Sequence, residues 1–212
     1  MEAWASTPPE KFNESGKDRA IKVESLLQRI IDERRAGNDN AVITTDHYNA
    51  LMKSWTVSGE RCGAAASRVQ QILLAMQQQY ADGDENVQPN LTSFEIAIEA
   101  WVRATDEPAA TARAQHILDY MTNIYLSDAN DQAKPHTSCF HPILKSLAAS
   151  GNNSDAPISC EHIIQWMQYL QRENGIDTVG PDTMCFNILM SSWLKSKDVN
   201  AEHHIMEVFD YM

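Results

Sequence analysis

The sequence predicts an all-α protein, a right-handed α-solenoid of antiparallel helix-turn-helix repeats. The first observation behind this prediction is a fixed period, because four aromatic residues follow one another at steps of 46 residues: Tyr48, Phe94, Phe140 and Phe186. The second is a matching column seven residues later, occupied by Trp55, Trp101, Leu147 and Trp193. The third is the lack of any stretch with the sustained alternation that predicts a strand. A period of this length is typical of stacked helical units, so we expect one elongated array across residues 1–212.

Each unit is expected to contain two amphipathic helices, and residues 93–121 show the pattern most clearly. The first half of this stretch places apolar side chains at helical spacing: Phe94, Ala97, Ile98 and Trp101. The second half repeats the spacing with Ala114, Ile117, Leu118 and Met121. Because each half has one apolar face, the two helices are predicted to pack on each other and on their neighbours.

We divide the array into a partial unit at 1–43 and further units at about 44–89, 90–135, 136–181 and 182–212. In the partial unit, residues 1–14 are expected to hold the tail of a first helix and a loop. A second helix should follow from about Ser15 to Arg35. The last unit is expected to be cut at its C-terminal end, because Met212 falls on the final core position of a second helix.

The unit at 44–89 illustrates the expected helix boundaries. Its first helix is predicted from Tyr48 to about Ser58, after the cap residues at 44–46, and Gly59 is its expected C-cap. Its second helix is predicted from Ala64 to about Tyr80.

The connections between units are acidic and end at a proline. Residues 82–86 precede Pro89, after which a new first helix is expected from Thr92. A proline recurs at the equivalent place in the next two connections, as Pro135 and Pro181. We expect the acidic runs around Asp84 and Asp128 to be solvated loops. Residues 151–155 are expected to form the internal loop of the third full unit.

Composition limits the classes of protein that fit. No run of about 18 apolar residues is present, so no membrane-spanning segment is predicted. The four cysteines, Cys62, Cys139, Cys160 and Cys185, are too scattered for a disulfide framework and are expected to be free thiols. The net charge of −12 argues against a general attraction to nucleic acid, although the predicted first helices carry several Lys and Arg residues.

Motifs for catalysis and for cofactor or metal binding are absent from the sequence. No P-loop, GxGxxG or GxSxG occurs, so we expect neither an enzyme nor a bound cofactor. The nearest approach to a metal-ligand set is His136, Cys139 and His141 with Cys160 and His162, but it lacks a CxxC pair or an HExxH helix, and no metal is expected. The Trp column could stack on bases, but its position beside aliphatic residues favours a core role.

The start of each unit resembles the pentatricopeptide repeat family. The likeness is carried by an aromatic-Asn-aliphatic helix start, as in residues 48–52 and 186–190, and by Pro-Asn or Pro-Asp at the unit junction, as in Pro89-Asn90 and Pro181-Asp182. The units are longer than is usual in that family, and the excess falls in loops.

This resemblance implies binding of single-stranded RNA by the first helices, in mitochondria or plastids and otherwise in the cytoplasm. It implies roles in RNA processing, stability or translation. Each base would be read by the residue after the aromatic and the residue after the junction proline: Asn49 with Asn90, Glu95 with His136, His141 with Asp182, and Asn187 without a partner. Arg103 and Lys195 occupy the place of a phosphate contact, where other units have Val57 and Ala149.

A second function stays open from the sequence. The net charge of −12 and the unusual base-reading candidates Glu95 and His141 also suit a protein-interaction scaffold without RNA binding.

Overall fold

The computed structural model describes residues 15–38, 40–58, 62–149 and 155–211. The predicted tail at 1–14, the C-cap at Gly59, most of the internal loop at 151–155 and Met212 lie outside these residues. Within them the chain forms α1 (Gly16–Arg35), α2 (Thr45–Thr56), α3 (Cys62–Ala81), α4 (Leu91–Val102), α5 (Ala110–Leu126), α6 (Thr137–Ala149), α7 (Ala156–Arg172), α8 (Thr183–Lys195) and α9 (Ala201–Tyr211). Three short 3-10 helices, η1 to η3, complete the described structure, which has no strand.

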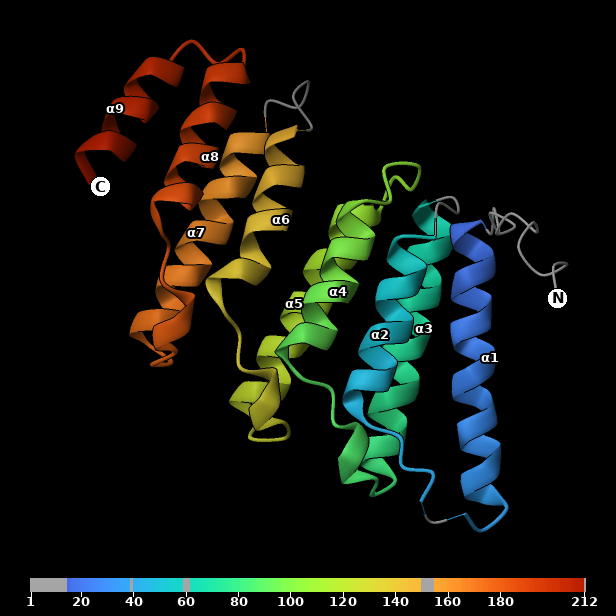
Figure 1. Cartoon of the computed structure of the whole chain (residues 1–212). Coiled ribbons are helices and arrows are strands. Elements are labelled where there is room, and N and C mark those ends of the chain that lie inside the picture. Colours follow the sequence, from blue (N-terminus) through green and yellow to red (C-terminus); the bar gives the residue numbers. More distant parts are fainter. Residues whose placement is uncertain (1–14, 39, 59–61, 150–154, 212) are drawn as a thin grey trace, which may run out of the picture.

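The helices pack pairwise in the order of the sequence, as Figure 1 shows from α1 to α9. In each pair the first helix packs on the second, as α4 does on α5. The first helices also contact one another directly, α2 with α4, α4 with α6, and α6 with α8. Each second helix contacts the first helix of the next pair. The two ends of the described chain therefore lie at opposite ends of the array.

The apolar columns predicted from the sequence form the core between these helices. Phe94 and Phe140 are fully buried, and each is the fourth residue of its helix. Trp55, Trp101 and Trp193 are also buried, which confirms that this column is core. The indole nitrogen of Trp101 donates a hydrogen bond to Gln70 Oε1 at 2.8 Å, so its polar edge is satisfied as well.

Capping residues explain where the helices begin. Ser15 forms a capping box with Asp18, so α1 begins at Gly16, as predicted to within one residue. Thr44 caps α2 in the same way with His47, and the helix therefore starts three residues before Tyr48. Asn90 accepts the backbone N–H of Ser93 and is the N-cap of α4.

The acidic connections have more structure than the solvated loops that we expected. Each contains a 3-10 turn, and the turns recur every 46 residues as η1 (Glu85–Val87), η2 (Asp131–Ala133) and η3 (Asp177–Val179). The last residue of each turn is fully buried. An apolar anchor therefore holds each connection, while most of its acidic residues are exposed.

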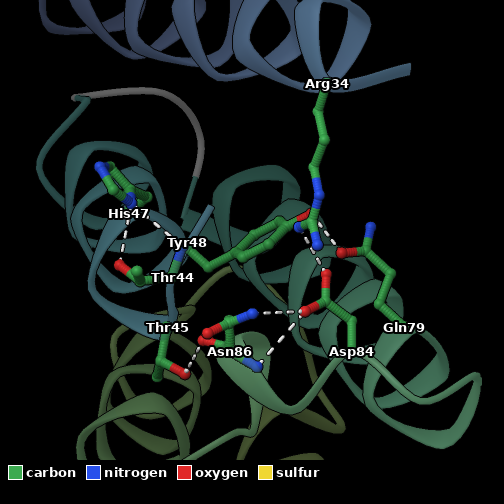
Figure 2. Close-up of polar contacts among 8 residues, drawn as sticks. All are labelled: Arg34, Thr44, Thr45, His47, Tyr48, Gln79, Asp84 and Asn86. Carbon is green, nitrogen blue, oxygen red and sulfur yellow. Dashed lines mark hydrogen bonds and ion pairs between the residues drawn. The ribbon is translucent and has the colours of Figure 1, made fainter. Parts of the chain in front are cut away.

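Polar contacts tie η1 to two neighbouring helices, as Figure 2 shows. Asp84 accepts from the Asn86 backbone N–H, which caps the turn, and its carboxylate contacts the Arg34 guanidinium at 2.8 Å. The Thr45 hydroxyl contacts the Asn86 carbonyl oxygen at 3.3 Å, as Figure 2 shows, and it donates to the Gln88 carbonyl oxygen at 2.6 Å. The connection is thus bound to the end of α1 and to the start of α2.

Candidate functional site

The predicted base-reading residues meet where one first helix passes the start of the next. The residue after the aromatic is always the fifth residue of a first helix, and the residue after the junction proline directly precedes the next first helix. Because consecutive first helices pack together, these two places are neighbours, and the third residue of the later helix joins them. We call the resulting sets junction cluster 1 (Asn49, Asn90, Ser93), junction cluster 2 (Glu95, His136, Cys139) and junction cluster 3 (His141, Asp182, Cys185).

Junction cluster 1 is a closed network of neutral groups. Asn49 Nδ2 donates to Asn90 Oδ1 at 3.2 Å, and the Ser93 hydroxyl lies 2.7 Å from Asn49 Oδ1 and 3.1 Å from Asn90 Oδ1. Asn49 is only 5% exposed. The structure therefore brings this predicted pair together, but most of its hydrogen-bonding capacity is used inside the protein.

Junction cluster 2 links its predicted pair through a third residue. The Ser138 hydroxyl donates to Glu95 Oε1 at 2.5 Å and lies 2.9 Å from His136 Nδ1. Burial, and to a lesser extent the nearby Glu95 carboxylate, raises the pKa of the Cys139 thiol to about 12. The thiol is neutral and packs as a small buried side chain.

Junction cluster 3 contains three chemically reactive groups in close contact. His141 Nε2 lies 3.0 Å from Asp182 Oδ1, and the backbone N–H of Cys185 donates to the same oxygen at 3.0 Å. Burial would raise the pKa of the Asp182 carboxyl, but these hydrogen bonds from Cys185 and His141 together hold it below its usual value. One nitrogen, oxygen or sulfur atom from each side chain lies within 4.8 Å of the others.

For a metal site, the sequence groups His141 with His136, Cys139, Cys160 and His162 instead. Cys160, a member of that expected set, lies on α7, where its thiol contacts the Leu144 carbonyl oxygen at 3.8 Å. The companions that the structure gives to His141 are 41 and 44 positions away, Asp182 and Cys185. The 46-residue period would have found this set if the third residue of each helix had been included with the base-reading pair.

Two depressions lie beside the clusters, between consecutive first helices. The first, of about 420 Å³, separates α4 from α6 and is lined by Glu95 and His141. Within α6, Pro142 has no N–H, so the Ser138 carbonyl lacks its helical donor at this depression. The second, of about 240 Å³, separates α6 from α8 and contains the exposed Asn187.

The cations at these depressions differ from the expected set. Arg103 lines the first depression, but its guanidinium is 2.9 Å from Glu99, which neutralises it locally. Lys195 lines the second, as predicted for a phosphate contact. Lys145 lines both depressions and is exposed, although sequence reasoning did not single it out for this role.

No described helix is both long enough and apolar enough to cross a membrane. Comparison of the chain with models of protein families, with curated proteins and with solved structures finds no match.

Proposed function

We propose that this protein binds single-stranded RNA along its first helices and acts in organellar RNA processing, stability or translation. We interpret the stacked helix pairs as a right-handed α-solenoid of the pentatricopeptide repeat type, with the first helices lining its inner face. The observation that carries the proposal is the recurrence of the junction clusters at every contact between consecutive first helices. A regular row of polar groups at one place per unit suits a polymer with one base per unit.

The accessible polar groups of this row are suited to base edges. The exposed Asn187 offers an amide donor and an amide acceptor together. His141 and Asp182 combine an imidazole with a carboxylate, and the Ser138 carbonyl, which lacks its helical donor, adds an acceptor next to Glu95. Asn49 is the least accessible candidate, so we expect it to position Asn90 more than to contact a base itself.

The charge distribution supports contact with a phosphate backbone despite the net charge of −12. Lys145 and Lys195 are exposed at the two depressions, and no ion pair involves either of them in the described part of the chain. Lys145 lies one helical turn before Ala149, which occupies the place of a phosphate contact. We infer that Lys145 takes that role in its unit.

The test is a salt titration of binding to a pool of single-stranded RNAs with charge-reversal variants. Lys145→Glu and Lys195→Glu should weaken all RNAs alike, and each should reduce the salt slope by about one, because phosphate contacts carry no sequence information. Arg29→Glu on α1 is the matched control, since it makes the same charge change at an exposed position away from the depressions. Asn187→Ala should change the preference at one nucleotide. Absence of binding even near about 50 mM salt, or equal effects of Lys145→Glu and Arg29→Glu, would refute the proposal.

A specific hollow favours the alternative function, a protein-interaction scaffold. It lies between the second helices α3 and α5, measures about 380 Å³, and exposes Leu74 and Tyr120 beside Arg113. An apolar hollow with one cation suits a peptide with an apolar side chain and a carboxylate. Leu74→Asp should abolish such binding without affecting RNA, which separates the two functions.

A further inference from the structure

We propose that junction cluster 3 is a zinc site, in which His141, Asp182 and Cys185 bind one Zn²⁺ ion. The three side chains come from two helices and the residue that caps one of them: His141 from the middle of α6, Asp182 from the N-cap of α8, and Cys185 from its first turn. Their ligand atoms already lie within 4.8 Å of one another. Of the described residues, only these three form such a convergent group.

The set of donor atoms selects the metal. Zn²⁺ binds imidazole nitrogen, thiolate sulfur and carboxylate oxygen in a tetrahedral arrangement, whereas Ca²⁺ and Mg²⁺ require oxygen ligands. Bond lengths of about 2.0–2.3 Å place tetrahedral ligand atoms about 3.3–3.8 Å apart. The 3.0 Å contact between His141 and Asp182 therefore has to open by only a few tenths of an ångström.

The existing hydrogen bonds leave room for the ion. Asp182 Oδ1 can keep the N-cap bond from the Cys185 N–H and bind the ion through its other lone pair, while the ion takes the place of the direct contact between His141 Nε2 and Oδ1. His141 would bind through Nε2 with its proton on Nδ1, and the Cys185 thiol would release its proton to the solvent as the Zn–S bond forms. The N-terminus of α8 disfavours a cation, but one carboxylate and one thiolate outweigh its partial positive charge.

A fourth ligand position would remain open to water. His141 is only partly buried and lines the depression between α4 and α6, which gives the site access to solvent. Three protein ligands with one open position are typical of zinc sites that can take a further ligand. The proposal does not depend on RNA binding, since it concerns the free protein.

The other two junction clusters are internal references for this site. Junction cluster 1 has two amides and a hydroxyl at the same three places. Junction cluster 2 has the same types of ligand, but the Ser138 hydroxyl bridges Glu95 and His136, and these groups do not converge. Metal binding should therefore be confined to junction cluster 3.

The experiment is a titration of the metal-free, reduced protein with Co²⁺, followed by displacement with Zn²⁺. We expect one equivalent of Co²⁺ to produce a sulfur-to-cobalt charge-transfer band and the visible bands of a tetrahedral site, and Zn²⁺ to remove both. Cys185→Ser should abolish the charge-transfer band. Asp182→Asn, which keeps a good N-cap residue, should weaken binding about tenfold or more.

Control variants make the result decisive. Cys139→Ser and Cys160→Ser should leave the titration unchanged, because these thiols are not in junction cluster 3. Serine occupies the place of Cys185 in junction cluster 1, so Cys185→Ser should keep its helical circular dichroism spectrum. Absence of a charge-transfer band, its survival in Cys185→Ser, or its loss in Cys139→Ser instead would overturn the proposal.

Discussion

Junction clusters 1 and 3 occupy the same three places of the repeat and differ in almost everything else. In the first, the amide of Asn49 is buried and engaged with Asn90 and Ser93. In the third, the His141 side chain is 20% exposed and that of Asp182 is 48% exposed, and both carry titratable groups. The backbone thus fixes where the three side chains meet, while the residue types decide whether that place is a structural link or a site for a ligand.

This difference shows how a repeat protein can separate stability from function. The closed amide network can hold α2 to α4 without titrating, and the open cluster can meet a ligand because α6 and α8 are held together by the apolar contacts around it. The following predictions test this contrast.

The largest effect is expected from a buried core residue that belongs to neither cluster. Trp101→Ala should lower the free energy of unfolding by about 3–5 kcal/mol, because Trp101 is 1% exposed on the central helix α4. Denaturant titration measures the change, with the exposed Leu194→Ala as control. A change for Trp101→Ala within about 0.5 kcal/mol would show that the stack does not rest on this column.

The two clusters should respond differently to truncation of the residue that follows the aromatic. Asn49→Ala should destabilise by about 1–3 kcal/mol, because it removes two hydrogen bonds of a buried side chain, from Asn49 Nδ2 to Asn90 and from the Ser93 hydroxyl to Asn49. His141→Ala should change stability by less than about 1 kcal/mol, since it removes a partly exposed contact. Equal losses, measured by denaturant titration of the metal-free proteins, would remove the distinction between the clusters.

Alkaline pH should affect junction cluster 3 through its thiol. Burial raises the pKa of Cys185 to about 12, so the neutral thiol stabilises the fold below the unfolded pKa of about 8.5. This stabilisation is lost as the pH rises from about 8.5 towards 12, by about 1.4 kcal/mol at pH 9.5. Comparison with Cys185→Ser isolates the effect, because a serine does not titrate there. Identical pH profiles from pH 7.5 to 9.5 would contradict the prediction.

Acidic pH should have the smallest effect. The pKa of Asp182 is lowered in the folded state, so its contribution is present above the unfolded pKa of about 3.9 and is lost as the pH falls through the folded value. We expect less than about 0.5 kcal/mol for so exposed a group. Asp182→Asn should flatten the stability profile between pH 2.5 and 5. A steeper dependence of stability on pH in the variant would show that the pKa of Asp182 is not lowered in the folded state.

Much of the fold followed from the sequence because the period and the helical spacing come from local repetition. They located the Trp column as core, whereas the pairing of His141 with Asp182 was implied by the family resemblance. Side-chain burial at Asn49 could not be predicted in this way, since it depends on how closely α4 approaches α2. The buried ends of the 3-10 turns, such as Val87, were missed because their acidic neighbours dominate the composition of the connection.

The cations were the least predictable part of the candidate site. Arg103 stands in the expected register but is held by Glu99 on the previous turn. Lys145 stands one turn out of register and is exposed at both depressions. The position of a residue in the repeat predicts where its side chain points. Whether that side chain can contact a ligand depends on neighbouring residues, which vary from unit to unit.

The junction contacts also set how far local unfolding spreads along the chain. Their polar bonds join residues 41 to 44 positions apart, as in Asn49 with Asn90 and Thr137 with Gly180. Each described unit completes its core with neighbouring helices of the array, so unfolding should proceed by fraying from the terminal helices, with amide exchange slowest near α4 and α6. A duplicated unit of 46 residues would therefore extend the array using only contacts that it already makes.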